Sequence, residues 1–240
     1  MHSFRSPDSR RLLGASVTMG LALVVFGASF GVVAVSAGAS VLQACALSLF
    51  VFTGASQMSA VSVIAAGGSA ASAFGGAALL AARNAVYGVA MSPHIAESRL
   101  ARAVGSHFVI DETTAMALAE HDLALRRRAF WMSGIVLGTS WNIGTLIGAA
   151  IGTAVDPQTF GLDAAFPVMF IAMLAPHLRT RAGRRAAAFG GIATVALAPF
   201  MPVGLPILVS AFGILFGLDP ASTAGEPAAA SGAPTTDGVP

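Results

Sequence analysis

An apolar stretch decides the fold of this chain. It begins with LLGASVTMGLALVVFGASFGVVAVSAG, residues 12–38, and continues to Ser92 with one charged side chain, Arg83. A membrane-spanning helix needs about 20 mostly apolar residues. An arginine in such a helix is costly to expose to lipid, so it normally faces a protein interior or a solvated pathway. Arg83, within LLAARNAVYGVAM, is therefore the first candidate functional residue.

The composition is typical of a polytopic membrane protein. Of the 240 residues, 55% are hydrophobic and 10% are charged, far from the balance of a soluble domain. The 13 Lys and Arg residues are all arginine, so the chain has no phosphate-binding Gly-Lys-Ser/Thr loop, which excludes ATP hydrolysis. The basic residues are not interleaved with aromatic ones, so we expect no nucleic-acid partner. Cys45 is the only cysteine, which excludes an intrachain disulfide and a cysteine metal cluster.

Apolar runs between charges and Gly/Pro breaks predict an all-α fold, a polytopic transmembrane helix bundle of about seven spans. The predicted spans cover residues 12–38, 41–66, 70–92, 129–154, 162–178, 186–201 and 203–218. Residues 1–11 form an N-terminal segment, cytoplasmic or external, and residues 12–218 form a transmembrane transporter domain. Residues 219–240 have no apolar face to bury and form a disordered tail. We expect a multi-pass protein of the cell inner membrane.

Arginine placement predicts the orientation but leaves one conflict. The arginines at 99–102, 126–128 and 179–185 indicate cytoplasmic loops. Counting back through seven spans then puts the N-terminus outside, although residues 5–11 carry three arginines. Either the first run is a hairpin that does not cross, or the segment around Asp111 crosses and makes eight. We predict that this polar segment is an interfacial or partly re-entrant helix.

Two internal similarities accompany these spans. VAMSPHIAESRLAR from Val89 and IAMLAPHLRTRAGRR from Ile171 both contain Met, then Pro-His, then arginines, which favours seven spans. FGASFG at 26–31 also resembles LGTSWN at 137–142. This second pair is compatible with an inverted repeat of three spans, the arrangement that builds midplane sites in many transporters. Close helix packing through small residues explains the same glycines.

Polar side chains of the second and third spans are candidates for a binding site. Gln57 needs several hydrogen-bond partners that lipid does not supply, so it contacts either another helix or a substrate. Arg83 lies within one turn of Asn84 and Tyr87, and its guanidinium could hold a substrate carboxylate. The alternative is an ion pair of Arg83 with the acids at 111–112. Those acids could also carry a coupling proton, or simply begin a solvated helix.

These same segments resemble the AzlC family, the large subunit of branched-chain amino acid exporters. GASQ at 54–57 matches the family's Gly-Ala-x-Gln pattern in the second span, and DET at 111–113 matches its Asp-Glu-Thr. The family's Asn-x-Arg in the third span is only partly matched, because Ala81 replaces the asparagine while Arg83 is retained. The resemblance extends from the first span through the sixth.

The resemblance implies a secondary transporter that exports leucine, isoleucine and valine, with methionine as a further candidate, driven by the proton gradient. It also implies a small four-span membrane subunit of the AzlD type as partner. We expect no cofactor, no metal site and no enzymatic activity. The predicted substrate-binding residues are Arg83, Asn84, Gln57, Ser56, Tyr87 and Asn142, and the predicted proton-coupling residues are Asp111 and Glu112.

A second hypothesis is a membrane scaffold or assembly subunit without transport of its own. It predicts that Gln57, Arg83 and Asp111 contact one another or a partner in a closed bundle without a cavity. An intramembrane enzyme is a third hypothesis, and it is weak because no Ser/His or paired-Asp motif lies at matched depth. Metal binding through His and Asp fails on spacing.

Overall fold

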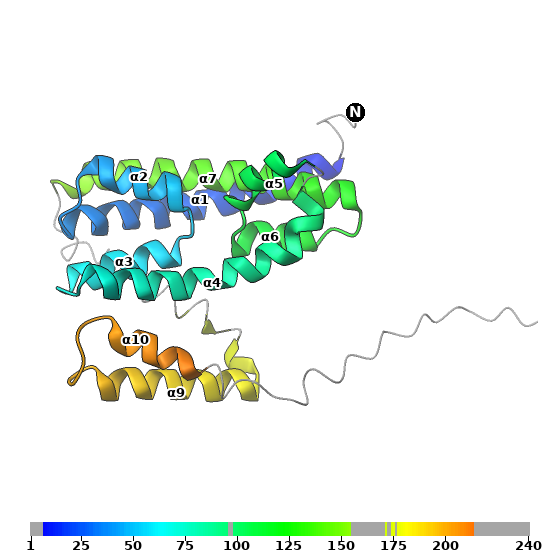
Figure 1. Ribbon diagram of the computed structural model, residues 1–240. Coiled ribbons are helices and arrows are strands. Elements are labelled where there is room, and N and C mark those ends of the chain that lie inside the picture. Colours follow the sequence, from blue (N-terminus) through cyan, green and yellow to red (C-terminus); the bar gives the residue numbers. More distant parts are fainter. Residues whose placement is uncertain (1–6, 96–97, 155–170, 172–173, 176, 214–240) are drawn as a thin grey trace, which may run out of the picture.

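The computed structural model describes residues 7–95, 98–154, 171, 174–175 and 177–213, and the residues that it describes form helices and no strands. Three helices are long: α1 (Pro7–Ser36), α4 (Ala70–Ile95) and α7 (Leu123–Gly152) (Figure 1). The shorter helices are α2 (Val41–Val51), α3 (Ala55–Ala65), α5 (Arg99–Ser106), α6 (Asp111–Leu118), α9 (Arg181–Leu197) and α10 (Leu205–Ser210), with 3-10 turns η2 (His177–Arg179) and η3 (Ala211–Gly213). The predicted all-α class is confirmed. Among the described residues, α1 and α7 are both long and apolar enough to cross a membrane.

Helices α1 and α7 lie against each other in parallel, as the pairing of their residues shows. Ser9 contacts Arg128 near the start of both helices, and Gly152 contacts Val32 near their ends. Glycines allow this close approach: a methyl group on Gly148 would collide with the backbone of Ala28. The similar segments 26–31 and 137–142 thus belong to two helices that run in the same direction. They therefore cannot be the inverted counterparts that their resemblance suggested.

The prediction of one continuous span over residues 41–66 is wrong, because the chain reverses there. Helix α2 ends at Val51, Phe52 adopts a left-handed backbone with φ 34°, and Gly54 follows with φ 60°. The Gln57 side chain then donates to the carbonyl of Leu47 over 3.0 Å. In a continuous helix these two residues would be about 15 Å apart along the axis. Helices α2 and α3 therefore form a hairpin whose tip is residues 52–54.

A second segment reaches the middle of the bundle from the opposite end. Gly105 of α5 lies against Ile95 and the ring of Trp131, and Phe108 lies deeper, against Gly134 and Gly138 of α7. Helix α6 then returns to Glu120, which binds Arg11 near the start of α1. Residues 107–118 thus enter the bundle and leave it at the same end, which is the course expected of a partly re-entrant rather than an interfacial segment.

The two ends of the bundle differ in charge. We call the end that holds the starts of α1, α7 and α9 the arginine end, and Figure 1 shows α4 running toward it. It gathers the described arginines outside α4, including Arg11 and residues 126–128. At the opposite end, the described turns 37–40, 66–69 and 198–204 contain no charged residue. The arginine loops therefore lie at one end of the bundle, as predicted, and the start of α1 lies with them.

Other predicted boundaries moved by a few residues or lie outside the described part. Helix α7 begins at Leu123 rather than 129, because the Asp122 side chain caps it by accepting from Leu125 N–H. Helix α9 begins at Arg181 rather than 186, where Thr180 supplies a similar cap. The span predicted over 203–218 is described only to Gly213, as α10 and η3. Most of the predicted span 162–178 and the tail 219–240 lie outside the described residues.

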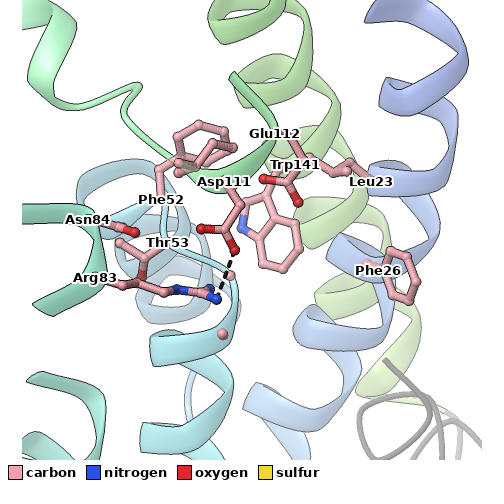
Figure 2. A pocket seen from close by; sticks show the side chains of 12 residues that line it. Leu23, Phe26, Phe52, Thr53, Arg83, Asn84, Asp111, Glu112 and Trp141 are labelled. Atoms are coloured by element: carbon pink, nitrogen blue, oxygen red, sulfur yellow. Dashed lines mark ion pairs between the residues drawn. The ribbon is translucent and has the colours of Figure 1, made fainter. Parts of the chain in front are cut away.

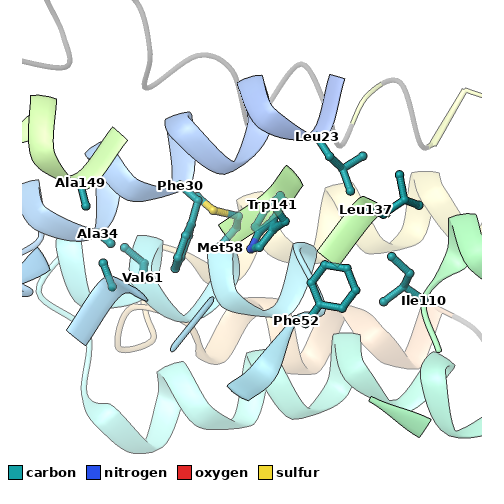
Figure 3. Close-up of a cluster of buried hydrophobic side chains, with 11 residues drawn as sticks. Leu23, Phe30, Ala34, Phe52, Met58, Val61, Ile110, Leu137, Trp141 and Ala149 are labelled. Carbon is teal, nitrogen blue, oxygen red and sulfur yellow. The ribbon is translucent and has the colours of Figure 1, made fainter. Parts of the chain in front are cut away.

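A hydrophobic core joins the hairpin tip to the parallel pair (Figure 3). Its buried members come from α1, α2, the hairpin tip, α3, α7 and the segment before α6. They are led by Leu23, Phe30, Phe52, Met58, Ile110, Leu137 and Trp141. The rings of Phe30 and Trp141 stack with centroids 5.9 Å apart. This core fixes the hairpin tip beside the middle of α1 and α7, where the cavity described next is found.

Candidate functional site

A cavity of about 330 Å³ lies about halfway along the three long helices (Figure 2). Each long helix contributes to it, and so do the hairpin tip and the first turn of α6. Its lining residues are Leu23, Phe26, Phe52, Thr53, Gly54, Ala55, Arg83, Asn84, Ile110, Asp111, Glu112 and Trp141. One wall is therefore apolar and the other carries a cation, two acids and an amide.

Arg83 of α4 and Asp111 of α6 form an ion pair across this cavity. The Arg83 Nη1 and the Asp111 Oδ2 are 2.8 Å apart, and about a third or less of each side chain is exposed. The pair predicted as an alternative to substrate binding is therefore present. The other carboxylate oxygen, Asp111 Oδ1, is buried and has no hydrogen-bond partner among the described residues. The ion pair thus joins α4 to α6 and leaves Asp111 Oδ1 available as a hydrogen-bond acceptor.

Gln57 holds the hairpin tip in shape. Its Oε1 accepts from the N–H groups of Thr53 (3.3 Å) and Gly54 (3.1 Å), while its Nε2 donates to Leu47. The side chain is 1% exposed and does not line the cavity. Because its amide binds the backbone at both ends, the structure gives Gln57 a positioning role. Ser56 is likewise buried, with its hydroxyl bonded to that of Thr53.

Thr113 plays the same part at the start of α6. Its Oγ1 accepts from the Ile110 N–H over 3.1 Å and donates to the Phe108 carbonyl over 2.6 Å. In both α3 and α6, therefore, the third residue of the helix reaches back to the backbone before it. The two tips meet, since the ring centroids of Phe52 and Phe108 are 6.2 Å apart. The N-termini of α3 and α6 thus face the same cavity from opposite ends of the bundle.

The structure brings together four of the eight predicted site residues. Arg83, Asn84, Asp111 and Glu112 line the cavity, and Asn84 Oδ1 is buried without a partner among the described residues. Tyr87, one turn further along α4, packs against a cluster that includes Met91 and also lies near Asp111 and Arg83 without lining the cavity.

Asn142 lies elsewhere, in the wall of a neighbouring cavity. Its Nδ2 donates to the carbonyl of Gly138 over 2.9 Å, within its own helix. The amide of Asn142 is thus bonded within its own helix and lies outside the cavity that holds Arg83. The prediction that Asn142 binds substrate therefore finds no geometric support. Figure 2 accordingly draws the site without it.

Trp141 is one of the lining residues that the sequence did not reveal. It lies in LGTSWN beside Asn142, and an aromatic residue in an apolar helix carries no signal of its own. Leu23 and Phe26 were missed for the same reason. Only the packing of α1 against α7 brings Leu23, Phe26 and Trp141 to the same cavity.

Comparison with known proteins gives a family match whose range includes this whole site. The family model described as AzlC protein matches residues 18–155, which include every residue that lines the cavity. The chain belongs to the AzlC family. The predicted resemblance is thereby confirmed.

Two relatives of this AzlC-family chain are uncharacterized membrane proteins. One, from Helicobacter pylori strain J99, is 25% identical over 188 residues, which are 77% of this chain and 82% of the relative. Another, from strain 26695 of the same species, is 26% identical over 188 residues, with the same shares covered. No solved structure matches the chain. Family and relatives together indicate a membrane protein with a role in transport.

Proposed function

We propose that this AzlC-family chain exports leucine, isoleucine, valine and methionine across the inner membrane in exchange for protons. A small four-span subunit of the AzlD type completes the transporter. The observation that carries the proposal is the cavity, in which Arg83 and Asp111 offer opposite charges beside an apolar wall. An amino acid with an aliphatic side chain has the same pattern of two charges next to an apolar group.

The charged end of the substrate binds at Arg83 and Asn84. The ion pair with Asp111 engages Nη1, and a guanidinium group has five N–H donors, so a substrate carboxylate can share it. Gln57 supports binding indirectly, through the shape of the hairpin tip. The aliphatic side chain lies against Leu23 and Phe26. Apolar walls discriminate one methylene group by only about 1–3 kcal/mol, so several aliphatic amino acids are accepted.

Glu112 is the better candidate for the coupling proton. Asp111 is held by Arg83, whereas no described basic residue forms an ion pair with Glu112, which lines the same cavity. A partly buried carboxyl group without an ion-pair partner is in an environment that favours proton exchange near neutral pH. The two adjacent acids therefore take different tasks, one in charge pairing and one in proton transfer.

The bundle crosses the membrane with α1, α4 and α7, and its arginine end lies in the cytoplasm. This orientation satisfies the positive-inside rule for the N-terminal arginines as well as for the loops. It also makes the protein multi-pass. The hairpin α2–α3 enters from outside, and residues 107–118 enter from the cytoplasm.

A scaffold without transport activity would favour a closed bundle. The cavity instead contains buried polar groups that the described residues leave unpaired, namely Asn84 Oδ1, Asp111 Oδ1 and Trp141 Nε1. Leaving such groups unpaired costs stability, and sites that do so are normally kept for a ligand. This favours transport over the scaffold hypothesis.

Leucine uptake by inside-out membrane vesicles tests the proposal. The chain is produced with the four-span subunit, and labelled leucine is supplied outside vesicles whose lumen is acidic. We expect uptake that depends on the pH gradient and falls at least about tenfold in Arg83→Ala, the loss typical of a charge-assisted hydrogen bond. The matched control is Arg99→Ala, since Arg99 is exposed in α5 outside the cavity.

The control should retain wild-type uptake. Uptake that does not respond to the pH gradient would contradict proton coupling. Undiminished uptake by Arg83→Ala would contradict the proposed site.

A further inference from the structure

Trp141 has an unusual environment for a packing residue. Its side chain is 4% exposed and lines the cavity, yet the indole Nε1 has no hydrogen-bond partner among the described residues. Trp131, by contrast, donates its Nε1–H to the Ile95 carbonyl over 3.0 Å. Buried indole N–H groups normally find an acceptor, and an unpaired donor costs stability. The Trp141 N–H is therefore available to a ligand in the cavity.

The start of α3 supplies further donors beside this indole. The first intrahelical bond of α3 runs from Met58 N–H to the Gly54 carbonyl, so the N–H groups of Ala55 and Ser56 precede it. Gly54 lies within van der Waals distance of the Trp141 ring, 3.8 Å from its Cη2 to a β-carbon placed on the glycine. Backbone N–H groups and the helix dipole at such a terminus favour an anion. Two elements thus present donors to one side of the cavity.

The opposite side presents acceptors. Asp111 Oδ1 and Asn84 Oδ1 are both buried there without a hydrogen-bond partner among the described residues. Figure 2 shows the Trp141 indole and the Asp111 carboxylate pointing into the same cavity. Donors on one side and acceptors on the other are complementary to a ligand that carries an anion and an ammonium group next to each other.

We infer that Trp141 is a substrate-binding residue whose indole N–H donates to the carboxylate of the transported amino acid, together with the N-terminus of α3. Asp111 and Asn84 accept from the ammonium group of the same molecule. Arg83 then stabilises the carboxylate by charge while it remains paired with Asp111. An indole has a donor and no acceptor, so it selects the carboxylate end rather than the ammonium end. This inference rests on the proposed function.

Replacement of each tryptophan by phenylalanine tests the inference by transport. Trp141→Phe keeps a ring to stack on Phe30 and removes the N–H together with part of the ring volume. We expect the KM for leucine to rise about tenfold or more, as for the loss of a hydrogen bond to a charged group. Trp131→Phe removes the N–H that binds Ile95, outside the cavity, so its KM should stay at the wild-type value while its melting temperature falls.

Isopentylamine, which is leucine without its carboxylate, separates recognition from packing. As a competitor of leucine uptake it should inhibit wild type and Trp141→Phe equally well, because it lacks the group that the indole binds. An unchanged KM for leucine in Trp141→Phe would overturn the inference. So would an equal weakening of leucine and isopentylamine, which is the result expected of a ring that only packs.

Binding measured without transport distinguishes failure of this inference from failure of the proposed function. The sequence has two tryptophans, so the Trp131→Phe protein contains Trp141 alone. Leucine should change its emission, and isopentylamine should do so only at a concentration at least tenfold higher. A leucine-dependent change in a protein that shows no flux would contradict export and support the binding role. Normal flux with no change in emission would contradict the binding role alone.

Discussion

Gln57 binds the backbone on both sides of a chain reversal with the two ends of its amide. Thr113 does the same with one hydroxyl at the start of α6. These are the final residues of the two matched family motifs, 54–57 and 111–113. At the scale of single residues, each motif therefore combines cavity-lining positions with one side chain that holds the backbone in place. Gln57 thus holds the backbone beside the site without lining the cavity.

Gln57→Leu should abolish transport and lower the melting temperature in detergent. The substitution keeps the volume but leaves the N–H groups of Thr53 and Gly54 and the carbonyl of Leu47 without their partner. Each buried unpaired group costs about 1–3 kcal/mol. The melting temperature can be followed by loss of the monodisperse peak in size-exclusion chromatography after heating.

Gln43→Leu is the matched control. Gln43 also accepts from a backbone N–H, that of Ser40, but on the exposed first turn of α2. It should lose little stability and no transport. Equal melting temperatures for wild type and Gln57→Leu would show that the tip does not depend on the amide.

At the scale of elements, the parallel pair α1 and α7 forms the fixed part of the bundle. Glycines of each helix face the backbone of the other in their C-terminal halves: Gly27 and Gly31 in α1, and Gly144, Gly148 and Gly152 in α7. Small residues are the usual means of close helix packing in membranes, where apolar side chains gain little by leaving lipid. The parts of the cavity wall that α1 and α7 supply therefore depend on this contact between the two helices.

Gly148→Ala should therefore destabilise the protein strongly. Its methyl group would collide with the Ala28 carbonyl, which is backbone and cannot move aside without separating the helices. We expect a fall of several degrees in the melting temperature in detergent. Gly14→Ala is the control, because Gly14 lies in α1 with open space around it. Similar melting temperatures for the two variants would contradict the close contact of α1 with α7.

At the scale of the whole molecule, two long helices are each followed by a segment that turns back. Helix α1 ends at the uncharged end, and the α2–α3 hairpin enters from there. Helix α4 ends at the arginine end, and residues 107–118 enter from that side (Figure 1). The units α1–α3 and α4–α6 thus run in opposite directions, which is the form of an inverted repeat. Their tips meet beside the cavity.

Cysteine labelling of the exposed turns should reveal this arrangement. In a Cys45→Ser background, Ser36→Cys and Ala66→Cys flank the hairpin, and both positions are exposed at the uncharged end. Both should react with a membrane-impermeant maleimide added to intact cells. Ala119→Cys, exposed near the arginine end, should react only after the membrane is permeabilised.

A continuous second span would put Ser36 and Ala66 on opposite sides of the membrane. Labelling of only one of them from outside would therefore contradict the hairpin. Labelling of Ala119→Cys in intact cells would contradict the proposed orientation.

The sequence by itself determined the helical class and the extents of α1, α4 and α7 to within a few residues, and it offered the pairing of Arg83 with the acids at 111–112 as one of two alternatives. These features depend on local apolar length and on the cost of an isolated charge in lipid, both of which can be evaluated along the chain. Only the tertiary structure decided the reversal at 52–54, the parallel course of α1 and α7, and the place of Trp141 in the cavity. Each of these rests on contacts between distant residues, such as Gly148 with Ala28, and an apolar run looks the same whether its helix crosses, turns back or lines a site.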